Sequence, residues 1–93
     1  MSNEIVASVW DAIEDNAVKA ENMKLRASLM MVLDRHIRTK GWTQAEAARR
    51  LGVTQPRISD LLRGKITLFS IDTLVSMLTE AGLRVEMRVG EAA

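Results

Sequence analysis

The feature of this sequence that most constrains its fold is the spacing of hydroxyl residues and glycines near its middle. Thr43 is followed by Glu46 three residues later, which is the pattern of a helix-capping box. Gly52 then ends the first helix, because glycine accepts the left-handed backbone of a tight turn. Thr54 caps a second helix, which Gly64 ends. The spacing therefore predicts two short helices joined by a turn of three to four residues.

Small and apolar residues within this segment favour a close crossing of the two helices. Ala48 is small where the helices should approach each other, and Pro56 lies in a first helical turn, where a missing N–H costs little. Val53, Ile58 and Leu61 supply apolar contacts that would set the crossing angle. This combination is typical of a helix-turn-helix unit, which presents the start of its second helix to the DNA major groove.

An apolar repeat predicts a longer helix before this unit, from residue 17 to about residue 40, with Gly41 ending it. Its apolar residues recur every four positions: Leu25, Leu29, Leu33 and Ile37, with Val32 beside them. Residues 1–16 have apolar residues at helix-like intervals between acids. The pair Asp15-Asn16 is interpreted as a break or an N-cap, which makes residues 1–16 a separate acidic arm.

A further helix is expected after the unit, capped by Ser70 and ended by Gly82. Phe69 and Leu74 would form the hydrophobic staple at its start. Its buried stripe is predicted to comprise Ile71, Leu74, Val75, Leu78 and Ala81.

The pattern then changes to the alternation of apolar and charged residues that is typical of a β-strand. Since no second convincing strand is present, a lone strand would leave its backbone groups unpaired, and we expect it to pair with a second copy. Antiparallel pairing about Val85 or Met87 would place Glu86 opposite an arginine. A disordered or self-packed tail is the alternative. The expected dimer contacts are Leu83, Val85, Glu86, Met87 and Val89.

These patterns predict an all-α bundle of four to five helices with a C-terminal strand that pairs across a dimer. The acidic arm would span residues 1–16, the helix-turn-helix domain 17–82, the dimerisation strand 83–89 and a short tail 90–93. The charge is uneven: residues 24–65 hold ten basic and three acidic residues, whereas the flanks are net acidic. A basic middle fits a phosphate-binding module, although a solvated helix surface gives the same pattern.

Composition argues against several other classes of protein. The chain has no cysteine and one histidine, His36, so cysteine chemistry and multi-histidine metal sites are excluded. No nucleophile–base pair or glycine-rich phosphate loop is visible, so we expect neither an enzyme nor a cofactor. No apolar run approaches the roughly 18 residues of a membrane span, and no secretory signal is visible. A cytoplasmic, nucleoid-associated protein without a membrane partner is expected.

Residues 43–65, TQAEAARRLGVTQPRISDLLRGK, resemble the helix-turn-helix of Cro/C1-type regulators, the XRE family. The resemblance covers roughly residues 17–89. It implies a lambda-repressor-like fold and a homodimer that binds an inverted repeat in double-stranded DNA as a repressor. Leu68-Phe69-Ser70 and the C-terminal strand are also similar to HigA-type antitoxins. That second resemblance implies a toxin protein as a partner.

The resemblance also implies roles for individual residues. Gln44 would hold a phosphate, Gln55 would bond to a base such as adenine, and Arg57 would contact guanine or a phosphate. Asp60 would accept from cytosine, or pair with Arg57 or Arg63. Pro56 stands where the family often has a polar base-reading residue. The candidate DNA contacts are Gln44, Thr54, Gln55, Arg57, Ser59, Asp60, Arg63 and Lys65, with Arg49 and Arg50 as further candidates.

Each of these residues also has an interpretation in which it serves the fold alone. Gln44 and Thr54 would then only cap helices, Ser59 would bond to its own helix, and Arg63 would interact with the helix dipole. His36 is interpreted as a surface or core-packing residue, and Trp42, Met30 and Met31 are interpreted as core or dimer contacts. Trp10 is either a staple onto the long helix or an anchor for a partner.

Overall fold

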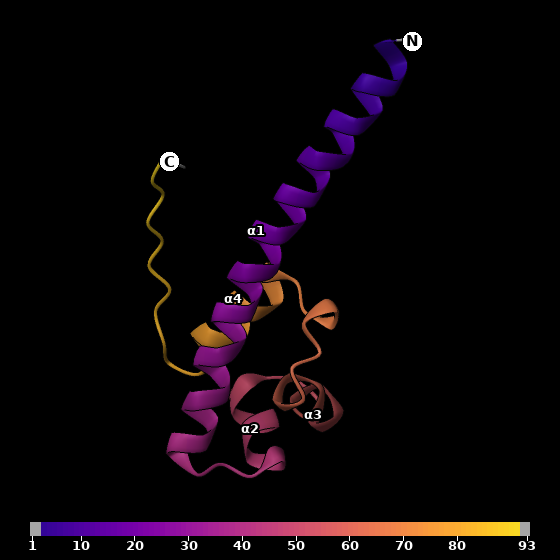
Figure 1. Ribbon diagram of the computed structural model, residues 1–93. Coiled ribbons are helices and arrows are strands. Elements are labelled where there is room, and N and C mark those ends of the chain that lie inside the picture. Colours follow the sequence, from indigo (N-terminus) through magenta and orange to yellow (C-terminus); the bar gives the residue numbers. More distant parts are fainter. Residues whose placement is uncertain (1–2, 92–93) are drawn as a thin grey trace.

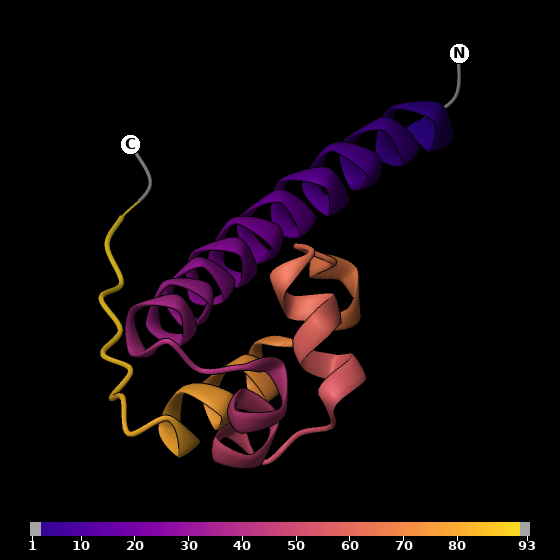
Figure 2. The same cartoon turned by 90° about the horizontal axis from the view of Figure 1, so that it is seen from below.

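The computed structural model describes the backbone of residues 3–91 and the side chains of residues 16–91. This part of the chain forms four α-helices and one 3₁₀ turn: α1 (Asn3–Lys40), α2 (Gln44–Leu51), α3 (Gln55–Leu62), η1 (Ile66–Leu68) and α4 (Ile71–Glu80). Figure 1 shows α1 as a long rod with the shorter helices gathered at its C-terminal half. In the turned view of Figure 2, those helices lie on one side of α1. The predicted all-helical architecture is confirmed for these residues.

Helix α1 is much longer than the sequence predicted. It continues through Asp15 and Asn16, so the break or N-cap predicted there is wrong. Each of these residues costs only about 0.7 kcal/mol in a helix interior, and neither glycine nor proline follows them to interrupt the backbone hydrogen bonds. The 38 residues of α1, at about 1.5 Å each, account for the longest dimension of the molecule, 59 Å. The expectation for Trp10 concerns a side chain outside the described ones.

The core lies where the C-terminal half of α1 meets the other three helices. The core residues are Met30, Leu33, Ile37, Ala47, Ala48, Leu51, Ile58, Leu61, Phe69, Leu74, Met77 and Leu78. The predicted positions Leu25 and Val32 are exposed instead. Both lie about 80° or more around the helix from every member of the row of Met30, Leu33 and Ile37, so the packed helices do not cover them.

Helix α4 buries a slightly different stripe from the predicted one. Leu74 and Leu78 are buried as expected, while Ile71, Val75 and Ala81 are half-buried. Met77, which the prediction omitted, is only 1% exposed. It lies three residues after Leu74, so it belongs to the same helical face.

The helix boundaries follow the predicted caps. The Thr43 hydroxyl accepts a hydrogen bond from the Glu46 N–H at 3.1 Å, and the Ser70 hydroxyl accepts one from the Thr73 N–H at 3.1 Å. Gly52 has a φ of 68°, so the turn after α2 uses the left-handed conformation that glycine allows. Thr54 occupies the N-cap position of α3 but makes no side-chain cap bond.

The C-terminal segment from Leu83 to Glu91 forms neither helix nor strand. Leu83 stays close to the domain, since its N–H donates to the Leu78 carbonyl at 2.9 Å and its side chain packs against the core. Val85, Met87 and Val89 are 36%, 71% and 86% exposed. A β-strand needs a hydrogen-bonded neighbour, and the described part of this single chain supplies none. The strand therefore stays a prediction.

Candidate nucleic-acid interface

Helices α2 and α3 form a compact pair with a short link. They are eight residues each, and the N–H of Val53 in the link donates to the Ala48 carbonyl at 3.0 Å. Ala48 is buried, as the close crossing requires, and Ile58 is fully buried beneath the start of α3. Burying one face of both helices fixes which side chains remain available for a ligand.

Several predicted contact residues lie exposed at the starts of these helices. Gln44 is the first residue of α2, Gln55 is the first residue of α3, and Thr54 precedes α3; all three are exposed. Because Thr54 makes no cap bond, its hydroxyl remains available for another partner. Exposed polar side chains at the start of α3 are the arrangement that major-groove contact requires.

Arg57, in the first turn of α3, is half-buried and is held against the fold. Its guanidinium carbon lies 4.6 Å from the centroid of the Phe69 ring, a cation–π contact. Phe69 is fully buried at the start of α4, so it is a fixed support. Helix α3 is thereby linked to the segment that precedes α4.

Asp60 pairs with Lys65, which differs from the sequence interpretation. The expected partners were Arg57 and Arg63, but the Asp60 carboxylate lies 3.4 Å from the Lys65 ammonium. Gly64, with a φ of 71°, turns the chain back after α3, and the Lys65 N–H donates to the Asp60 carbonyl at 3.1 Å. The turn thus brings Lys65 beside Asp60, so the negative charge that would repel DNA is offset locally.

The remaining predicted contacts on α3 differ in exposure. Arg63 is exposed at the C-cap of α3, and its backbone N–H donates to the Ser59 carbonyl at 3.1 Å. Ser59 is half-buried. Like the exposed residues at the starts of α2 and α3, Ser59 and Arg63 belong to the helix-turn-helix unit and the turn after it, which is where the sequence placed them.

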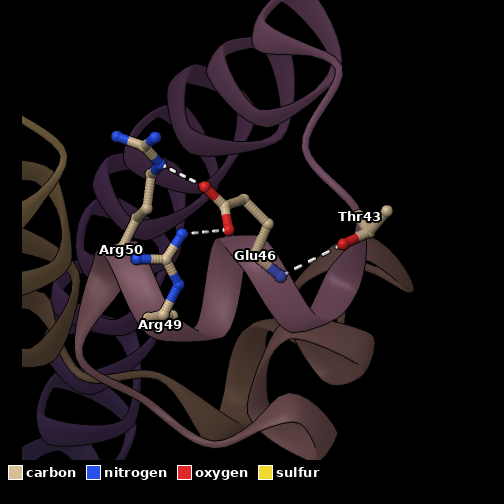
Figure 3. Close-up of polar contacts among 4 residues, drawn as sticks. All are labelled: Thr43, Glu46, Arg49 and Arg50. Atoms are coloured by element: carbon tan, nitrogen blue, oxygen red, sulfur yellow. Dashed lines mark hydrogen bonds and ion pairs between the residues drawn. The ribbon is translucent and has the colours of Figure 1, made fainter.

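Arg49 and Arg50 are both bound to Glu46 (Figure 3). The Arg50 Nε donates to the Glu46 carboxylate at 2.6 Å, and Arg49 donates to its other oxygen. These bonds, first that from Arg49 and then that from Arg50, lower the pKa of the Glu46 carboxyl below its usual range. The Glu46 carboxylate therefore binds the two arginines, whereas the Thr43 hydroxyl provides the N-terminal cap of α2. The spacing of three and four residues could have revealed this cluster in the sequence.

Aromatic packing accounts for the neighbouring residues. The His36 and Trp42 rings meet edge to face, with centroids 5.3 Å apart. The Arg50 guanidinium lies 5.1 Å from the Trp42 ring centroid. Met30 is in the core, whereas Met31 is 62% exposed. Packing was the interpretation of His36, Trp42 and Met30, and these contacts confirm it.

One residue with a long-range contact escaped the sequence analysis. Arg26, on α1, donates from Nη1 to the Phe69 carbonyl at 3.4 Å and from Nε to the Asn22 side chain at 2.5 Å. Its link to Phe69 joins positions 43 residues apart in the chain. No local spacing signals such a contact, and only the fold brings the two together.

Residues 3–91, which the structure describes, also bear on metal binding and membrane insertion. No group of three or more metal-ligating side chains occurs among them. No helix among them is long and apolar enough to cross a membrane.

Two short helices that are linked by a glycine turn and packed on a helical bundle define a helix-turn-helix protein. The chain belongs to the helix-turn-helix domain family, whose model matches residues 12–90. A solved structure assigned to the XRE family of transcriptional regulators is 31% identical, with a TM-score of 0.74. The match covers 80% of this chain and 83% of that one. The resemblance to Cro/C1-type XRE proteins is thereby confirmed. No curated protein matches the chain.

Proposed function

We propose that this protein is a transcriptional repressor that binds an inverted-repeat DNA operator as a homodimer. The observation that carries the proposal is that Thr54 and Gln55 are exposed polar residues at the start of α3, while Ile58 of the same helix is fully buried in the core. The XRE assignment of the similar structure supports the regulatory role. A dimer would place two recognition helices about 34 Å apart, so the half-sites should be one helical turn apart.

The test is selection from a randomised duplex library at about 150 mM salt, where non-specific phosphate binding is weak. We expect the wild-type protein to recover an inverted repeat. Gln55→Ala should lose preference at one position in each half-site, because glutamine bonds to adenine through two hydrogen bonds. Ser76→Ala, an exposed change on α4, is the matched control and should select the wild-type sequence. Recovery of no motif by folded protein would contradict the proposal.

A second candidate function is that of an antitoxin which binds a small basic, RNase-type toxin and represses its own operon. Two observations favour it: α1 extends well beyond the helical cluster in Figure 1, and residues 1–23 carry five acidic residues and one basic residue. An acidic helix suits a basic partner. Co-expression with the product of a neighbouring gene tests this function. The full chain should retain a basic partner that a variant lacking residues 1–16 loses, while both bind DNA. If both proteins retained the partner equally, residues 1–16 would have no role in binding it.

A further inference from the structure

A polar surface pocket of about 510 Å³ lies where α1, α3, η1 and the start of α4 meet. Its lining shares Arg57 with the first turn of α3 but does not include Thr54 or Gln55. Its polar lining residues include Asn22, Arg26, Arg57, Thr67, Ser70 and Asp72.

Two guanidinium groups meet at this pocket on a common support. Arg57 stacks on the Phe69 ring, with 4.6 Å to its centroid, and Arg26 donates to the carbonyl of the same residue at 3.4 Å. Asn22 holds the Arg26 Nε at 2.5 Å. Each of these contacts is with a neutral group, so the contacts position the guanidinium groups and leave both positive charges uncompensated.

The charge balance of the pocket favours an anion. Among the side chains of residues 16–91, no carboxylate lies within ion-pair distance, 4.0 Å, of Arg26 or Arg57. Asp72 lines the pocket but pairs with neither arginine. Like charges in one pocket repel each other, and a bound anion removes that repulsion.

We propose that Arg26 and Arg57 form a phosphate subsite, which takes a backbone phosphate of the duplex beside the base pairs that α3 faces. This inference rests on the proposed function. Guanidinium groups bind phosphate through paired N–H donors, which makes arginine the side chain best matched to this anion. Because Arg57 lies in the first turn of α3, a duplex bound at the start of α3 would have its phosphate backbone close to the pocket. Helix α1 then contributes a DNA contact from outside the helix-turn-helix unit.

The test compares Arg26→Gln with Arg35→Gln. Nine residues separate the two positions, two and a half helical turns, so the two side chains leave α1 on opposite sides. Both substitutions remove one positive charge, and Arg35 is exposed. We expect Arg26→Gln to weaken binding of the selected operator roughly tenfold or more, because the variant loses charge-assisted hydrogen bonds to one phosphate. The slope of log K against log salt should fall by about 0.9, the value for one phosphate. Arg35→Gln should keep the wild-type slope.

Three further measurements separate phosphate binding from a structural role. The loss from Arg26→Gln should be equal on operator and shuffled duplexes, because phosphates carry no sequence. Arg26→Lys should retain the wild-type salt slope. A neutral methylphosphonate, moved along the operator backbone, should at one position weaken the wild-type protein more than it weakens Arg26→Gln, which keeps only Arg57 on that phosphate. A wild-type salt slope for Arg26→Gln, or equal losses for both proteins at every backbone position, would overturn the subsite.

Failure of the proposed function gives a different result. In that case the wild-type protein binds no duplex selectively, and inorganic phosphate becomes the probe. Saturable shifts of the Arg26 and Arg57 Nε–Hε resonances, absent for Arg35, would then support an anion site that serves a free phosphate and not DNA. Unchanged resonances would overturn the site itself.

Discussion

At the scale of single residues, Glu46 controls how much positive charge α2 presents. Its carboxylate binds both Arg49 and Arg50, which the sequence analysis had considered as DNA contacts. Both arginines are exposed, so these ion pairs contribute little to stability, and their main effect is on where the two guanidinium groups lie. Arg50 is further held by Trp42.

Replacing Glu46 with glutamine should therefore change DNA binding and its dependence on pH. The substitution frees two positive charges, so non-specific duplex binding should tighten and its salt slope should steepen. Because the pKa of the Glu46 carboxyl is lowered in the folded protein, the stability that it contributes is present above the unfolded pKa. That stability is lost as the pH falls through the folded pKa. Urea unfolding at pH 7 should give a higher free energy of unfolding for the wild type than for Glu46→Gln, and this difference should shrink as the pH falls through the folded pKa of Glu46. A difference that persists at low pH would contradict this.

At the scale of the elements, the cap and glycine signals predicted the short helices well, whereas the break predicted at Asp15-Asn16 was wrong and the long-range contacts were not predicted. Caps and glycine turns act over a few residues, so Thr43, Gly52 and Ser70 marked the helix boundaries correctly. The contact of Arg26 with Phe69 arises from tertiary packing and has no signal in the sequence. The pairing of Asp60 with Lys65 needed the turn at Gly64 to be known in three dimensions.

The turn between α2 and α3 offers a direct test of the local argument. Gly52 has a φ of 68°, and a Cβ added there would meet only the Glu80 Cγ, at 4.0 Å. Gly52→Ala should therefore cost about 1–2 kcal/mol of unfolding free energy through backbone strain alone, without a clash. Gly90→Ala is the control, because its added Cβ has open space and its φ is not positive. Chemical denaturation measures both variants. A neutral Gly52→Ala would show that the turn relaxes into another conformation.

At the scale of the whole molecule, the exposed apolar residues point to assembly. Met87 and Val89 are largely exposed on the C-terminal segment, while Val18 and Leu25 are exposed on α1. Two surfaces could thus bury apolar area against a second copy. The alternation of charged and apolar residues favours the C-terminal segment, because antiparallel pairing of two copies would satisfy backbone groups as well as side chains.

Removing the residues after Arg84 should therefore convert a dimer into a monomer without unfolding the domain. The cut leaves Leu83 in place, which packs against the core and bonds to Leu78, so circular dichroism should show an intact helical fold. Sedimentation should give monomer mass for the shortened chain and dimer mass for the full chain. Binding to the full operator should weaken much more than binding to a single half-site, since the two recognition helices are no longer linked. Met31→Ala, at an exposed apolar residue of α1, should leave the mass unchanged. A shortened chain that stays dimeric would place the interface on α1 instead.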